Sequence, residues 1–147
     1  MKPSGAAPYL LAACVVFSLG ALLALRPHAA EERSAAAGAE FVGESKHCVS
    51  GLDDVRRLCS PAIVDHDRCM EATPQHARLE REKIDPRSAL GQILLSEARR
   101  RVTSACTTVM KRHDHCSIWR ELRRADGGDI PDRTDDVRAH IAGDSDL

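Results

Sequence analysis

The sequence predicts an all-α fold in which a single transmembrane helix precedes an antiparallel helical hairpin with a long second helix. Two observations indicate this fold. An apolar run without charged residues extends from Ala6 to Leu25. Farther along, two cysteine pairs, Cys59 with Cys69 and Cys106 with Cys116, each enclose nine residues. Ten residues along a helix span about 15 Å and nearly a whole number of turns, so both thiols of a pair lie near one helix face.

The N-terminal segment, residues 1–25, contains the predicted membrane span. The 20 residues of its apolar run correspond to about 30 Å of helix, which matches the hydrocarbon core of a bilayer. A cleaved secretory signal is the alternative, because Ala37-Gly38-Ala39 offers a small-residue cleavage site before Glu40. That site lies well beyond the apolar run, so we favour an uncleaved anchor. Charge alone does not determine its orientation.

The rest of the chain divides into three parts. Residues 26–46 form a linker rich in Ala, Gly and Glu. Residues 47–125 form the helical hairpin, and residues 126–147 an acidic tail that either drapes over a partner or stays mobile. The first hairpin helix begins at a capping box at Ser50, and Pro61 predicts a kink or a break inside it.

The second hairpin helix is predicted from Pro86 to about Ala125, just before Gly127-Gly128. At about 1.5 Å per residue this helix is roughly 60 Å long, much longer than its partner helix. Its first half should therefore be buried against another subunit. The residues expected to bind that partner are Leu90, Ile93, Leu94 and Leu95.

The cysteines compensate for a thin hydrophobic core. Beyond residue 25 the only aromatic residues are Phe41 and Trp119, and such a core rarely holds a small domain together alone. If the second helix runs back along the first, each thiol of one pair meets a thiol of the other, and we expect two disulfides in an oxidising compartment. A remaining cysteine, Cys48, is interpreted as a free thiol; a bond to another subunit and displacement of Cys59 are the alternatives.

No motif of a known enzyme class or cofactor site occurs in the sequence, and we expect a non-enzymatic protein without a bound cofactor. His113, His115 and Cys116 form an H-x-H-C cluster, with His66 near Cys69. Bridged cysteines cannot act as thiolate ligands, and zinc motifs place paired ligands two to four residues apart, so no metal site is predicted.

Charge is segregated along the chain although the net charge is only −1. Residues 74–125 hold 12 Lys or Arg against 6 Asp or Glu, whereas the tail from Asp126 holds 7 Asp against two Arg. The basic stretches suit anionic lipid or an acidic partner, although a solvated helix face is the simpler interpretation. With no overall basic excess and almost no aromatic residues for base stacking, nucleic-acid binding is not expected.

The paired C-x9-C arrangement over residues 59–116 resembles the twin CX9C, or CHCH (coiled-coil-helix-coiled-coil-helix), family of the mitochondrial intermembrane space. The resemblance implies disulfides from Cys59 to Cys116 and from Cys69 to Cys106. It also implies oxidation by the intermembrane-space disulfide relay during import. The chain departs from the family in its long spacer between the pairs, in Pro61 and in the appended membrane segment.

On this resemblance we expect a non-catalytic accessory subunit of a mitochondrial oxidative phosphorylation complex, either a respiratory chain complex or ATP synthase. The expected location is the inner membrane, with contacts to membrane lipid, a single span and the soluble domain in the intermembrane space. One alternative is an assembly factor or a factor that organises the inner membrane. The other is a secreted or periplasmic disulfide-bonded binding domain.

Overall fold

The computed structural model describes residues 40–143, which combine helices with short strands. The prediction of an all-α fold is therefore wrong. In chain order the elements are β1 (Phe41–Val42), η1 (Ser45–His47), β2 (Cys48–Gly51), η2 (Val55–Arg57), β3 (Pro61–Ile63), α2 (His66–Glu71), α3 (Pro74–Arg81), α4 (Ala89–Arg112), β4 (Ser117–Trp119), β5 (Arg123–Arg124) and α5 (Thr134–Gly143).

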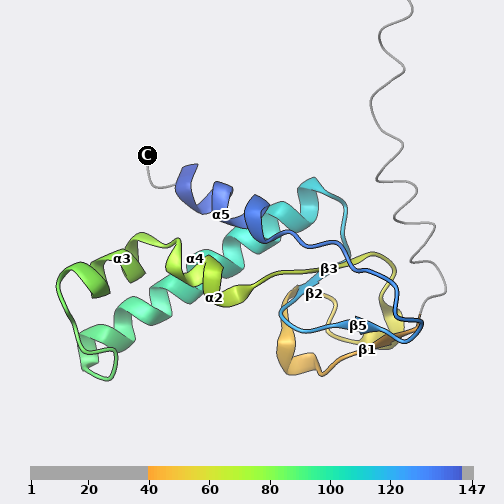
Figure 1. Ribbon diagram of the computed structural model, residues 1–147, viewed down its shortest axis with the longest axis horizontal. Helices are drawn as coiled ribbons and strands as arrows, with labels where there is room; N and C mark the ends of the chain where they lie inside the picture. Colours follow the sequence, from red (N-terminus) through yellow and green to blue (C-terminus); the bar gives the residue numbers. More distant parts are fainter. Residues whose placement is uncertain (1–39, 144–147) are drawn as a thin grey trace, which may run out of the picture.

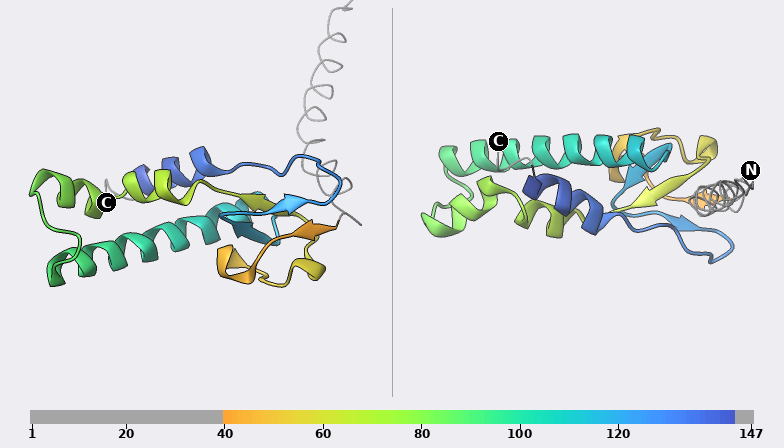
Figure 2. Two further views of the ribbon diagram at one scale, coloured as in Figure 1. Left: turned by 60° about the horizontal axis from the view of Figure 1, so that its bottom comes forward. Right: turned by 90° about the horizontal axis from the view of Figure 1, so that it is seen from above.

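The long helix α4 extends along most of the molecule (Figure 1). The strands gather near its C-terminal end, whereas α3 and the first turns of α4 form the opposite end (Figure 2). Helices α2, α3 and α5 all pack against α4. The described part of the chain is thus an elongated body with a helical end and a strand end.

Strand β4 is the centre of a three-stranded sheet with the order β2-β4-β3. β2 runs antiparallel to β4, with a register irregularity between Cys48 and Ser50, and β3 runs parallel to β4. A parallel neighbour requires a long crossover connection, which α2, α3 and α4 supply. β1 and β5 form a separate antiparallel pair.

The first hairpin helix is replaced up to Asp65 by short strands, the 3-10 turn η2 and irregular segments. Where the helix was predicted to begin, Ser50 belongs to β2, and Pro61 begins β3. A proline at the first residue of a strand is tolerated because its missing N–H is needed least there. The chain becomes helical only at His66, where the side chain of Asp65 accepts a hydrogen bond from the Arg68 amide (3.0 Å).

The second hairpin helix forms as α4, but it begins three residues after the predicted Pro86 and ends earlier than predicted. Ser88 caps the start of α4 by accepting a hydrogen bond from the Gly91 amide (3.0 Å). The helix ends at Arg112 because Asp114 adopts a left-handed conformation (φ 62°) and the His115 amide donates to the Met110 carbonyl (2.9 Å). This Schellman-type ending turns the chain into β4, so the predicted helix to Ala125 is wrong.

The main core lies between α4 and the elements packed against it. Five apolar positions of α4, spaced three or four residues apart, are buried: Leu94, Ala98, Val102, Ala105 and Val109. Ile118 of β4 is fully buried in the same core, whereas Trp119 anchors a second cluster with Phe41, Leu58 and Leu122. The Trp119 indole N–H donates to the Ser117 hydroxyl (2.8 Å), which satisfies a buried polar atom.

The acidic segment after Asp126 contributes to this core. α5 buries Val137 and Ile141 completely against the cluster built on α4. Its aspartates face outward, with Asp135 exposed and Asp136 beside His113 at 3.4 Å. α5 is therefore an amphipathic helix, and it holds two of the aspartates of this segment, Asp135 and Asp136.

No helix between Glu40 and Gly143 is long and apolar enough to cross a membrane. The predicted localisation, a single-pass inner-membrane protein with its soluble domain in the intermembrane space, conflicts with this finding and is wrong for the part of the chain that the structure describes. The run Ala6–Leu25, on which the transmembrane prediction rested, lies outside the described residues.

Candidate functional site

Two adjoining hollows at the strand end of the molecule form the candidate site. Their volumes are about 660 Å³ and about 500 Å³. Both are lined by His47, Ile63, Arg120 and Glu121, so we treat them as one groove. Its walls come from η1, from the junction between β3 and α2, and from the segment between β4 and β5.

Backbone hydrogen bonds fix these walls to one another. The Arg120 amide donates to the His47 carbonyl (2.8 Å), and the Val64 amide donates to the Trp119 carbonyl (2.8 Å). Because Trp119 is fully buried, these bonds tie the lining of the groove to the core. The side chains of the groove therefore project from a rigid support rather than from a free loop.

Two of the carboxylates that line the groove have structural roles. Asp65 caps α2, as described above, and Asp132 accepts hydrogen bonds from the amide (2.8 Å) and the hydroxyl (2.6 Å) of Thr134. Asp67 differs, because its side chain is 99% exposed. The negative charge in the groove is therefore partly engaged in capping and partly open to solvent.

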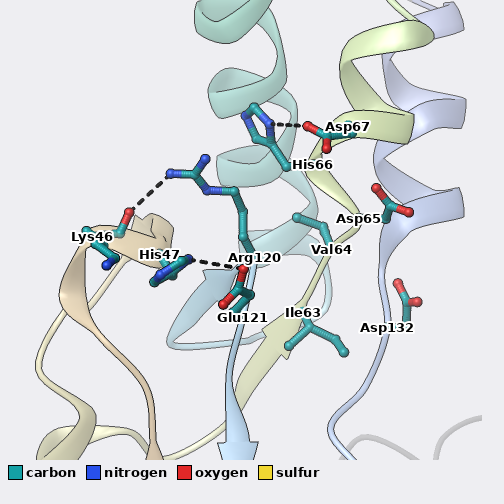
Figure 3. Close-up of a pocket in the computed structure, with 10 residues that line it drawn as sticks. All are labelled: Lys46, His47, Ile63, Val64, Asp65, His66, Asp67, Arg120, Glu121 and Asp132. Carbon is teal, nitrogen blue, oxygen red and sulfur yellow. Dashed lines mark hydrogen bonds and ion pairs between the residues drawn. The ribbon is translucent and has the colours of Figure 1, made fainter.

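Two basic side chains face one end of the groove (Figure 3). The Arg120 guanidinium donates from Nη2 to the Lys46 carbonyl (3.1 Å), and within residues 40–143 no carboxylate lies at ion-pair distance from it. The His66 side chain is only 15% exposed, with Nδ1 3.8 Å from Asp67. Burial, together with the charge of Arg120, lowers the pKa of His66 despite the nearby carboxylate.

The cysteines form no disulfide in the described structure. All five described cysteines are free thiols, so the predicted stapled hairpin is wrong. The structure nevertheless places Cys59 against Cys116, whose Sγ accepts hydrogen bonds from the Cys59 amide (3.2 Å) and the Ser60 amide (3.1 Å). The mitochondrial and respiratory assignments depended on the hairpin and have no support in this structure.

The other predicted pair, Cys69 and Cys106, is fully buried in the main core. Burial raises the pKa of Cys69 to about 11 and that of Cys106 to about 12. Both thiols therefore behave as small apolar side chains. Cys48 is part-buried, and burial raises the pKa of its thiol as well.

The histidines of the H-x-H-C cluster lie outside the groove. His115 is buried, with Nδ1 3.3 Å from the Ser60 hydroxyl and 3.2 Å from the Ser60 carbonyl. Arg133 donates to Nε2 of the same ring (3.0 Å), and His113 stacks on it with ring centroids 6.2 Å apart. Among the described residues, no group of three His, Cys, Asp or Glu side chains is arranged to hold a metal ion.

The four residues predicted to bind a partner are divided by the fold. Leu90 and Ile93, in the first turns of α4, are 44% and 55% exposed, whereas Leu94 is only 4% exposed. Leu95 is part-buried and packs against the main core. Only Leu90 and Ile93 therefore remain available to another molecule.

Sequence reasoning did not identify the groove residues as a site. Lys46, His66 and Arg120 are separated in the chain and meet because β4 pairs with β2 on one side and in parallel with β3 on the other. The clearest local signal was the basic stretch that begins at Arg120. Comparisons with protein-family models, with curated proteins and with solved structures found no match to this chain.

Proposed function

We propose that this chain is a non-catalytic binding protein that holds an extended polypeptide segment of a partner in the groove. One observation carries the proposal: the two hollows join into a single groove, and its walls are fixed by backbone hydrogen bonds to one another and to the buried Trp119. A preformed surface of this kind limits the ordering cost of binding.

The lining chemistry suits a polypeptide better than a compact small molecule. Apolar side chains from Val42 and Ile63 lie beside charged groups of both signs, including Arg120 and Glu121. Small-molecule pockets are usually enclosed and mainly apolar, with few polar groups. A peptide presents alternating apolar and polar groups, which matches a mixed and open groove.

The position of the nucleophilic side chains supports binding rather than catalysis. No Ser, Thr, Cys or Tyr lines either hollow. The buried Ser60 hydroxyl lies beside His115, whose ring is already engaged by Arg133 and by the Ser60 carbonyl. That pair therefore lacks the open substrate position that nucleophilic catalysis requires.

Selection of peptides from a random library on the full-length protein tests this proposal. Glu121→Trp places a large ring at the junction of the two hollows, and Glu97→Trp is the matched control on the exposed face of α4. Selected peptides should bind the control like wild type, and Glu121→Trp about tenfold more weakly or worse. Failure to enrich any peptide, or equal binding by both variants, would contradict the proposal.

The exposed pair Leu90 and Ile93 supports a second candidate, the role of accessory subunit. In this case another subunit covers the first turns of α4. Native purification of wild type and of the Leu90→Asp, Ile93→Asp double variant tests it, with Glu97→Gln as a control. Loss of a stoichiometric subunit from the double variant alone supports this role, and unchanged composition contradicts it.

A further inference from the structure

We propose that Arg120 and His66 form a carboxylate-binding subsite at one end of the groove, which takes a C-terminal or side-chain carboxylate of the partner polypeptide. The proposal rests on the proposed function, because it names the group that the groove recognises. Both side chains line the larger hollow (Figure 3).

The Arg120 guanidinium is positioned but has spare hydrogen-bonding capacity. Its backbone amide and its Nη2 are both held by η1, through the carbonyls of His47 (2.8 Å) and Lys46 (3.1 Å). The hydrogen bond from Nη2 uses one of its five guanidinium N–H groups, and a guanidinium fork matches a carboxylate in geometry. An arginine already held by its backbone loses little freedom when it binds an anion.

The groups around His66 favour an added negative charge. Arg120 faces it from the segment after β4, and Arg99 acts on it from α4. The opposing group is Asp67 of α2, which is 3.8 Å away and 99% exposed, so solvent screens much of its effect. An anion between Arg120 and His66 would offset the repulsion that Arg120 and Arg99 exert on the protonated form of His66.

The charge balance favours a carboxylate over a phosphate. Asp65, Asp67, Glu121 and Asp132 also line this hollow, and they would repel a dianion more strongly than a monoanion. The amine of Lys46 is already paired with Glu44 at 2.7 Å, so it does not add a third free cation. The subsite therefore matches a single negative charge.

Binding through this subsite should depend on pH. A bound carboxylate favours protonated His66, so affinity should rise by up to about tenfold for each unit by which the anion raises the histidine pKa. The gain should build up as pH falls from the His66 pKa of the complex to the lower pKa of the free protein, which lies below the ordinary histidine value of about 6.5.

Side-chain NMR of the full-length protein tests the subsite with sodium acetate as the probe and sodium chloride as the ionic-strength control. Acetate should shift the His66 ring and Arg120 Nε–H resonances saturably and raise the pKa of His66. Arg120→Gln should abolish saturation, whereas Arg57→Gln, an exposed residue of η2, should change affinity by less than about twofold. Dispersed amide spectra confirm that each variant is folded.

Further probes identify the source of the anion. N-acetyl-trialanine and N-acetyl-Ala-Glu-Ala-amide distinguish a C-terminal from a side-chain carboxylate, and N-acetyl-trialanine-amide is the neutral control. Tighter binding of inorganic phosphate than of acetate would overturn the carboxylate assignment. If selected peptides bind the groove but acetate shifts neither the His66 nor the Arg120 resonances, the subsite alone is overturned. If acetate binds but the library selection enriches no peptide, the polypeptide-binding function is overturned and the site is one for small anions.

Discussion

The backbone amide of Cys59 donates a hydrogen bond to the Sγ of Cys116 at 3.2 Å, across 57 positions of sequence. The next amide, of Ser60, donates to the same sulfur at 3.1 Å. Burial alone would raise the pKa of Cys116, but these two amides and the Cys59 thiol together lower it below its usual value. Cys116 is therefore the described cysteine best prepared to form a thiolate.

The thiols should react with iodoacetamide in a defined order in the native protein. Cys116 has a lowered pKa and should be alkylated first. Cys59 is exposed and should follow, because its hydrogen bond to Cys116 raises the pKa of its thiol. Cys69 and Cys106 should react at least about a hundredfold more slowly, because they are buried and have raised pKa values. Peptide mapping after timed alkylation measures the order. Equal labelling rates, or a bridge between Cys59 and Cys116, would contradict this prediction.

Val137→Asp should unfold the described domain, although it lies in the acidic C-terminal part of the chain. Val137 is fully buried in the main core, and an unpaired buried carboxylate costs several kcal/mol. Ala139→Asp is the matched control on the exposed side of α5, with an expected change within about 0.5 kcal/mol. Urea unfolding followed by circular dichroism compares the two. Similar stability of both variants would mean that α5 is not part of the folded core.

The sequence predicted the elements governed by local chemistry. Helical periodicity predicted α4 and its buried stripe, although the cap is Ser88 and the helix begins at Ala89, three residues after the predicted Pro86. Its end at Arg112 depends on a left-handed aspartate, Asp114, where glycine is the usual signal. Trp119 also continues the helical spacing of apolar residues approximately, so no sign of the turn into β4 was visible in the sequence.

The strands and the groove depended on contacts that no local pattern contains. β3 has three residues, and its pairing partner β4 lies beyond three helices. The equal cysteine spacing suggested helices on both sides of each thiol, yet Cys59 lies between η2 and β3. Arg120 and His66 come together only through this parallel pairing. Their role therefore could not be derived before the topology was known.

Acidification should destabilise the fold through His66. Its pKa is lowered in the folded state, first by burial and then by Arg120, so the unfolded state binds the proton more readily. This contribution to stability is complete above the unfolded pKa of about 6.5 and is lost as pH falls toward the folded value. Urea unfolding at about pH 7.5 and pH 5.5 should show a smaller pH effect for His66→Gln than for wild type. An equal pH effect in both proteins would exclude a contribution from His66.

Two adjacent residues of α4, Leu94 and Ile93, should differ strongly in how much their truncation destabilises the fold. Leu94→Ala should lower the free energy of unfolding by about 2–5 kcal/mol, because Leu94 is 4% exposed and its loss leaves a cavity. Ile93→Ala should change it by less than about 0.5 kcal/mol, because Ile93 is 55% exposed. Urea unfolding of the isolated protein measures both. If Ile93→Ala is neutral for folding but weakens association with a subunit in native purification, Ile93 belongs to a docking surface. If it destabilises the isolated chain as much as Leu94→Ala, Ile93 is a core residue and the accessory-subunit surface must lie elsewhere.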